Sequence, residues 1–180
     1  GLINALGEWV LKTACAEAAS WATPLKVSVN VSPIQLMNTS LTDTIIEVLH
    51  QTGLDPRRLD LEITESDVFN ENTRSLEILS QLRELGIQIS IDDFGTGYSS
   101  LSRLSYFPFD KIKIDRSFVI NIPEQKDDLD IVRLIISMGK SLHMRIVAEG
   151  VETEEQLASL QALGCDLVQG YLIGKPSPLR

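Results

Sequence analysis

Helical and strand-like patterns alternate along the whole chain of 180 residues, and this alternation constrains the fold more than any other feature. The helical segments place apolar residues three and four positions apart, whereas the strand segments are short and rich in Val and Ile. No low-complexity tract or long linker interrupts the series. Helix–strand alternation produces parallel sheets through right-handed crossovers, so we predict one α/β domain over residues 1–180.

Six helices and six strands are expected. The predicted helices span residues 2–21, 41–50, 73–85, 98–106, 129–142 and 153–163, and the predicted strands span residues 25–31, 59–64, 87–92, 111–115, 145–149 and 166–169. Several strands alternate apolar and polar residues, whereas strands buried between two helical layers of an open sheet are nearly continuous apolar runs. The alternation favours a TIM-like barrel whose polar strand face lines a site. Such barrels have eight strands, so either two units are missing or the sheet is open.

Composition excludes several classes of protein. The 25 acidic and 16 basic side chains give a formal charge of −9, which disfavours binding to duplex DNA through its phosphates. With only two histidines, a histidine-rich zinc site is excluded. No segment reads as a membrane span or a signal peptide, so we expect a cytoplasmic setting. Cys15 and Cys165 are expected to be buried reduced thiols.

Each predicted strand carries a polar residue near its carboxyl end, and in a parallel barrel those ends converge on one mouth. These residues are Asn30, Glu62, Asp92 with Asp93, Lys113 with Asp115, Glu149 and Gln169. Carboxylates this close repel one another unless cations share them, and oxygen ligands suit Mg²⁺ or Mn²⁺ rather than zinc. The adjacent Asp92 and Asp93 suit bridging of two ions, an arrangement used for in-line displacement at phosphorus. Such ions would let an acidic protein bind a phosphate ester.

Structural alternatives exist for each of these residues. Asn30 precedes Ser-Pro and could form a turn, and Glu65 could cap a helix. Lys113 could form a structural ion pair with Asp115 alone. Glu149, before Gly150, could serve only as a cap, and Gln169 could serve only to satisfy the last strand. For residues 92–100 an Asx turn is the alternative, but two acids, two glycines and a hydroxyl cluster at a strand end favour a functional loop. Its glycines permit a mobile lid.

Six motifs resemble one family in order and spacing over the entire chain. They are residues 30–35 (NVSPIQ), 61–65 (LEITE), 92–101 (DDFGTGYSSL), 113–118 (KIDRSF), 148–152 (AEGVE) and 169–171 (QGY). The pattern resembles EAL domains, bacterial phosphodiesterases that linearise the signalling nucleotide cyclic di-GMP. The resemblance implies a modified (β/α)8 barrel, a two-metal site with Mg²⁺ or Mn²⁺, and hydrolysis of cyclic di-GMP to linear pGpG.

The resemblance also implies roles for single residues. Asn30, Glu62 and Asp92 would hold one ion, and Asp92 with Asp93 would help to hold the second. Lys113 and Glu149 would position and deprotonate the attacking water. Gln169 would be a positioning residue beside them, and Asp115 would belong to the same shell.

A lid loop is implied as well. It spans residues 94–100 and includes Phe94, Gly95, Thr96 and Gly97. Glu65 resembles the residue that anchors this loop, through which the family couples dimerisation to activity. A homodimer is therefore expected.

One departure from the family pattern lies at the N-terminus. The Glu-Ala-Leu segment, with its metal-binding glutamate and a following substrate-binding arginine, is absent, and residues 1–4 resemble the interior of the family's pattern. We therefore expect the chain to be the C-terminal three quarters of an EAL domain, with about two strands missing. Hydrolysis should be slow or absent until that segment is restored. The family also implies upstream sensory or nucleotide cyclase domains, and segments outside this chain could anchor the whole protein to a membrane.

Two other functions compete with the phosphodiesterase. The chain could be a non-catalytic cyclic di-GMP receptor, or a regulatory or assembly module that uses the same fold without a nucleotide. The downstream motifs favour the enzyme, because a receptor does not need Lys113 and Glu149 together with both aspartates.

Overall fold

The computed structural model describes residues 2–38, 40–66, 73–97, 104, 107 and 109–177. Its helices are α1 (Leu2–Ser20), α2 (Pro33–Leu36), α3 (Leu41–Thr52), the 3-10 helix η1 (Pro56–Arg58), α5 (Thr73–Glu84), α7 (Arg116–Val119), α8 (Lys126–Ser141) and α9 (Glu154–Leu163). Its strands are β1 (Val27–Asn30), β2 (Leu59–Thr64), β3 (Gln88–Phe94), β4 (Lys111–Ile114), β5 (Arg145–Ala148) and β6 (Leu167–Val168). The chain forms two compact units, Gly1–Ser90 with Ser100–Phe109 and Ile91–Ser99 with Asp110–Arg180.

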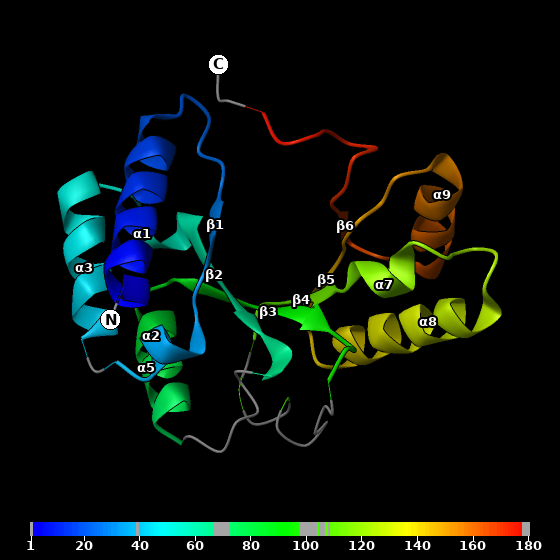
Figure 1. Cartoon of the computed structure of the whole chain (residues 1–180), viewed down its shortest axis with the longest axis horizontal. Coiled ribbons are helices and arrows are strands. Elements are labelled where there is room, and N and C mark those ends of the chain that lie inside the picture. Colours follow the sequence, from blue (N-terminus) through cyan, green and yellow to red (C-terminus); the bar gives the residue numbers. More distant parts are fainter. Residues whose placement is uncertain are drawn as a thin grey trace. The chain divides into compact units, whose positions relative to one another are not determined.

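The first unit holds β1, β2 and the start of β3, in that order. β1 and β2 are parallel, and their register places Asn30, the last residue of β1, beside Glu62, which lies two residues before the end of β2. Helix α1 contacts β1 and α3, and α3 in turn contacts α5 (Figure 1). The apolar stripe of α1 buries Leu11, Cys15 and Ala18. The core of this unit therefore forms where its helices meet its strands.

The second unit continues from the end of β3 through β4, β5 and β6. β4 is parallel to β5, and β5 is parallel to β6. Helix α8 contacts β4, β5 and the short helix α7 (Figure 1). Helix α9 begins at a capping box in which Thr153 and Gln156 each accept the other's backbone N–H. Gly164 ends α9 in the left-handed conformation, with φ of 77°.

The predicted class is confirmed, because helices alternate with parallel strands in both units. The polar faces of β2 and β4 are enclosed rather than solvated, since all four residues of β4 are buried, as are five of the six in β2. On β1, in contrast, Ser28 and Asn30 are exposed. Helices α2 and α7 are additions to the predicted elements. The predicted helix at residues 98–106 lies outside the described residues except at position 104.

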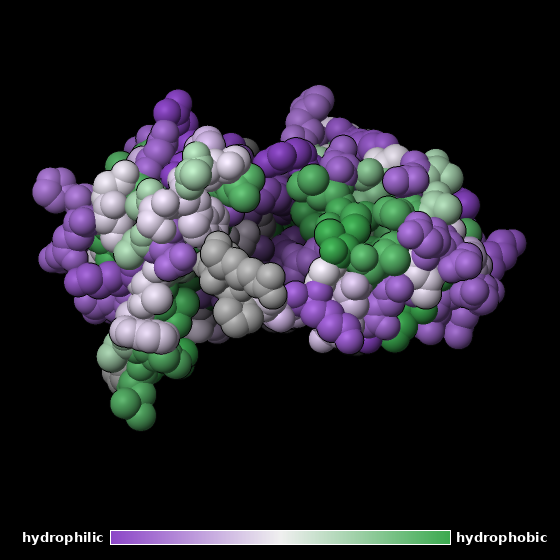
Figure 2. All heavy atoms as spheres, turned by 90° about the horizontal axis from the view of Figure 1, so that it is seen from above, coloured by the Kyte–Doolittle hydropathy of each residue, from purple (hydrophilic) through white to green (hydrophobic). Residues whose placement is uncertain are grey.

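Among the helices that the structure describes, none is both long enough and apolar enough to cross a membrane. Hydrophilic residues cover much of the visible surface in Figure 2, and hydrophobic residues gather in separate patches. Some of the exposed apolar side chains lie on α1, where Leu2, Leu6 and Trp9 are more than half exposed.

Candidate functional site

Lys113 links two of the predicted acidic residues in the second unit. Its Nζ atom lies 3.0 Å from Asp92 Oδ1 and 2.8 Å from Glu149 Oε1. The side chain of Lys113 is only 6% exposed, so both ion pairs are largely shielded from water. Strand β4 holds Lys113 between Ile112 and Ile114, which are fully buried. Lys113 therefore pairs with groups at the ends of both neighbouring strands, rather than with Asp115 alone.

Three carboxylates meet beside Lys113. One oxygen each from Asp92, Asp93 and Glu149 can be chosen so that all three atoms lie within 4.8 Å of one another. The pKa of Asp93 is raised, first by burial and then by the negative charges of Asp92 and Asp115, while Lys113 opposes the shift. One ammonium group thus faces more than one carboxylate, which leaves a local excess of negative charge that a bound cation would neutralise.

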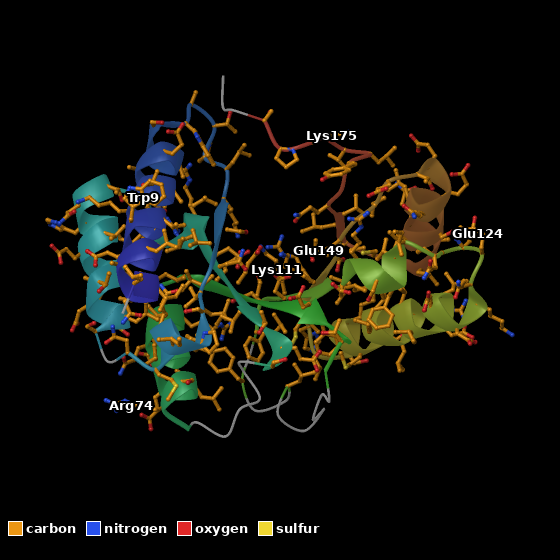
Figure 3. The ribbon with its side chains drawn as sticks, viewed as in Figure 1. Trp9, Arg74, Lys111, Glu124, Glu149 and Lys175 are labelled. Carbon is orange, nitrogen blue, oxygen red and sulfur yellow. The ribbon has the colours of Figure 1, made fainter. Side chains whose placement is uncertain are left out.

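Backbone contacts place Glu149 directly after β5 (Figure 3). Its N–H donates to the carbonyl oxygen of Ile114 at 3.2 Å, which extends the pairing of β4 and β5 by one residue. The next residue, Gly150, has a φ of 70°, which is readily adopted only by glycine. Glu149 is therefore held at the point where β5 ends, at the start of the segment 149–151.

Asp115 caps a helix at the edge of this cluster. Its side chain accepts a hydrogen bond from the Ser117 backbone N–H at 3.0 Å and another from the Ser117 hydroxyl. This makes Asp115 the N-cap of α7. Its charge also contributes to the raised pKa of Asp93, so Asp115 lies close to the acidic cluster as well.

Gln169 follows β6 and is fixed through its backbone. Its N–H donates to the Ala148 carbonyl at 2.8 Å, and its carbonyl accepts from the Val151 N–H at 3.0 Å. The next residue, Gly170, lies against the Val151 backbone so closely that a Cβ atom would come within 2.1 Å of the Val151 carbonyl oxygen. Gln169 is thereby tied to the segment 149–151, and its side chain is exposed.

Asn30 and Glu62 are neighbours in the first unit. They occupy matching positions on β1 and β2, and the Val31 N–H donates to the Glu62 carbonyl at 2.9 Å. Glu62 is buried, whereas Asn30 is exposed. Glu65, also in this unit, is 1% exposed. The predicted site residues are thus assembled in two groups, one in each unit, and the anchoring role of Glu65 remains a prediction.

The described part of the predicted lid loop begins with a compact turn. Thr96 donates a hydrogen bond from its hydroxyl to the Asp93 carbonyl at 2.9 Å, and Gly95 has a φ of 101°. Phe94 is buried, and its carbonyl accepts from the Asp115 N–H at 3.4 Å. Gly97 is the last described residue before the gap at residues 98–103.

Two contacts next to this cluster were not predicted from the sequence. Arg116 and Glu152 form an ion pair with 2.7 Å between Nη2 and Oε1, and Gln156 bridges Glu152 to the end of α7. Arg116 and Glu152 lie inside the motifs that carried the resemblance, so their positions were a signal. The link made by Gln156 spans 36 residues of sequence and follows only from the tertiary structure.

Known proteins resemble this chain over nearly its whole length. The EAL domain model matches residues 1–176. An uncharacterized signaling protein of Caulobacter vibrioides is 55% identical over 99% of this chain and 22% of its own length. From Pseudomonas aeruginosa, cyclic di-GMP phosphodiesterase NbdA is 45% identical over 99% of this chain and 23% of its own length. The bifunctional diguanylate cyclase/cyclic di-GMP phosphodiesterase MucR of the same organism is 44% identical over 99% of this chain and 27% of its own length.

A solved structure gives the same result. The MucR phosphodiesterase in complex with c-di-GMP superposes with a TM-score of 0.95 at 44% identity, covering 99% of this chain and 74% of that one. The chain thus spans between about a fifth and a quarter of the length of the curated relatives named above. Because the family model covers nearly every residue and the fold agrees with that of MucR, the predicted TIM-like fold of the EAL type is confirmed, and the chain belongs to the EAL domain family.

Proposed function

We propose that this chain carries the hydrolytic centre of a metal-dependent phosphodiesterase that cleaves cyclic di-GMP to linear pGpG. The observation that carries the proposal is the cluster of Asp92, Asp93 and Glu149 around the shielded ammonium group of Lys113. The names of NbdA and MucR, which include cyclic di-GMP phosphodiesterase, support the choice of substrate.

The donor atoms of the cluster fit a hard divalent cation. Carboxylate oxygens from Asp92, Asp93 and Glu149 are the type of ligand that Mg²⁺ and Mn²⁺ prefer. We propose Asp92 and Asp93 as ligands in this unit, and Asn30 and Glu62 as further ligands from the ends of β1 and β2. When bound, the ions would polarise a phosphoryl oxygen and favour ionisation of a water molecule.

The other residues of the cluster act on protons and charge. Glu149 would accept the proton of the attacking water, since it is held by its backbone at the end of β5 and by Lys113 at 2.8 Å. Lys113 would offset the negative charge that develops on the phosphate. We assign Gln169 and Asp115 to positioning. The backbone of Gln169 is hydrogen-bonded to Ala148 and Val151 on either side of Glu149, and Asp115 caps α7 directly after β4, which carries Lys113.

Product analysis tests the proposal. The full-length protein containing this chain is incubated with cyclic di-GMP and either Mg²⁺, Mn²⁺ or a chelator, and the nucleotides are separated by liquid chromatography. We expect pGpG to form only when a divalent ion is present. Binding of cyclic di-GMP without any hydrolysis would instead assign the chain to the non-catalytic receptors. Absence of both binding and hydrolysis would favour the regulatory or assembly module that uses this fold without a nucleotide.

Metal binding is tested separately by calorimetric titration. Mg²⁺ or Mn²⁺ is titrated into the chain and into its Asp92→Asn variant, because loss of one shared carboxylate should weaken the site. We expect a clearly lower affinity in the variant. Equal affinities in the two proteins would show that Asp92 is not a ligand.

Three further assignments extend this proposal. We propose that the protein acts as a homodimer, which light scattering of the purified protein tests by its mass. We propose sensory or nucleotide cyclase domains elsewhere in the whole protein, in line with the bifunctional name of MucR and the much greater length of the relatives. We also propose a cytoplasmic location for the domain, where a nucleotide messenger would reach it.

A further inference from the structure

Two loops of the second unit are joined by side chains outside the proposed catalytic set. One loop leads from β4 into α7, and the other leads from β5 into α9. Arg116, the first residue of α7, pairs with Glu152 across these loops with 2.7 Å between Nη2 and Oε1. Each loop follows a strand that carries a member of the cluster, Lys113 in β4 and Glu149 directly after β5. The pair therefore joins the chain segments on which both groups depend.

The stem of Arg116 also lies against the backbone next to Glu149. A Cβ atom at Gly150 would come within 2.2 Å of Arg116 Cγ and within 2.8 Å of its Cβ and Cδ. Gly150 is thus required twice, because its φ of 70° disfavours other residues and because Arg116 fills the space that a side chain would occupy. Through this contact, the position of Arg116 limits where the segment 149–151 can lie.

Gln156 makes a second connection between the same loops. Its side chain is 4% exposed, and its Oε1 atom accepts from the N–H groups of Glu152 at 2.7 Å and Thr153 at 3.1 Å. Its Nε2 group donates to the carbonyl of Ile120, the C-cap of α7, at 3.1 Å. Arg116 and Gln156 therefore hold Glu152 from two sides, by its carboxylate and by its backbone.

We propose that Arg116, Glu152 and Gln156 form a latch that positions Glu149 opposite Lys113. These are positioning residues, because they act through Glu149. The catalytic consequence of the latch rests on the proposed function. The Glu149 N–H donates to the Ile114 carbonyl at 3.2 Å, which is at the long end of the usual range for a hydrogen bond. The segment 149–151 therefore gains from additional support.

Because the Arg116–Glu152 pair is partly exposed, its proposed role in positioning Glu149 can be distinguished from a general contribution to folding stability. The Arg116 and Glu152 side chains are 53% and 35% exposed, and exposed pairs contribute little to folding. The Arg133–Asp130 pair on α8 is a matched control, at 2.5 Å with side chains 55% and 48% exposed. Removal of either ion pair should leave the protein folded. Only removal of the Arg116–Glu152 pair should change the position of Glu149.

The first test measures amide hydrogen exchange by NMR in the chain and in Arg116→Met, Glu152→Gln and Arg133→Met. The amide of Glu149 donates to the Ile114 carbonyl, and the amide of Val151 donates to the Gln169 carbonyl. Their exchange therefore reports on the segment 149–151. We expect their exchange to accelerate by about two- to fivefold in the first two variants, as loss of a partly exposed pair implies, and to be unchanged in Arg133→Met. Exchange that is unchanged in all three variants would overturn the latch.

The second test measures cyclic di-GMP hydrolysis by the full-length protein carrying the same variants. We expect kcat to fall by about 10- to 100-fold in Arg116→Met and Glu152→Gln, with KM nearly unchanged and partial recovery in Arg116→Lys. Unchanged kcat in both variants of an active protein would overturn the positioning role. A wild-type protein that hydrolyses nothing, together with faster exchange in the two variants, would overturn the proposed function and support the latch as a structural element.

Discussion

Asp93 combines an unfavourable backbone with an unfavourable charge. Its φ of 53° lies in the left-handed region, and its carboxyl group is partly desolvated beside Asp92 and Asp115. Each feature costs free energy in the folded chain, and such costs gather at ligand sites. The metal-free protein therefore carries a local instability that a bound cation would relieve.

We predict that Asp93→Asn stabilises the metal-free chain. The pKa of Asp93 is raised on folding, so the folded state holds the proton more tightly, and stability falls as the pH rises from the ordinary aspartate pKa through the raised value. Asparagine removes this loss and tolerates positive φ. Urea unfolding with a chelator should give a higher free energy of unfolding for the variant at neutral pH, and a smaller difference near pH ~4.

The control for this prediction is Asp130→Asn, which removes a carboxylate from an exposed ion pair. That variant should not gain stability at any pH. If Asp93→Asn is less stable than the wild type at neutral pH without metal, the charge argument is wrong.

Cys15 is expected to be chemically inert in the folded protein. Burial raises the pKa of its thiol to about 11, so almost none of it is thiolate at neutral pH. Burial is also the main cause of the raised pKa of Cys165, but that side chain is partly accessible. With a thiol reagent, Cys165 should react first and Cys15 only on unfolding. Rapid modification of Cys15 in a native Cys165→Ser variant would contradict this account.

At the scale of elements, the N-cap of α9 should make a measurable contribution to stability. The Thr153 side chain accepts from the Gln156 N–H at 3.2 Å, and its loss leaves a helical N–H without that partner. We predict that Thr153→Ala lowers the free energy of unfolding by about 1 kcal/mol. Ser40→Ala is the control, because in the described structure the Ser40 side chain makes no capping bond to α3. Equal losses in both variants, measured by urea unfolding, would argue against the capping box.

The elements differ in how well the sequence could predict them. β2 spans the predicted residues 59–64, because its alternation of apolar and polar residues is clear. α8 starts at Lys126 rather than at the predicted residue 129. Its first turn is polar, so the periodic spacing of apolar residues that predicts a helix is missing there. α2 and α7 have four residues each, which is too short for any period to show. β6 has only two residues, because only Val147 and Ala148 of β5 pair with it.

For the molecule as a whole, most of the candidate site could be predicted from the polar residues near the carboxyl ends of the predicted strands. Asp92, Asp93, Lys113 and Glu149 could be expected together because parallel strands bring their carboxyl ends to one edge. The ion-pair partners of Lys113 could not be predicted, since the sequence also allows a pair between Lys113 and Asp115. The register of β4 with β5, together with the backbone bond from Glu149 to Ile114, settles that choice.

Glu149 and Lys113 are the two residues that we propose to act in the chemical step. The most direct measurement is steady-state hydrolysis of cyclic di-GMP, with Mg²⁺ or Mn²⁺, by the full-length protein and its Glu149→Gln and Lys113→Ala variants. We expect kcat to fall by about 10²–10⁴-fold in Glu149→Gln, and also strongly in Lys113→Ala, with little change in KM. Variants that alter KM alone, with kcat at the wild-type value, would assign both residues to substrate binding and contradict the account.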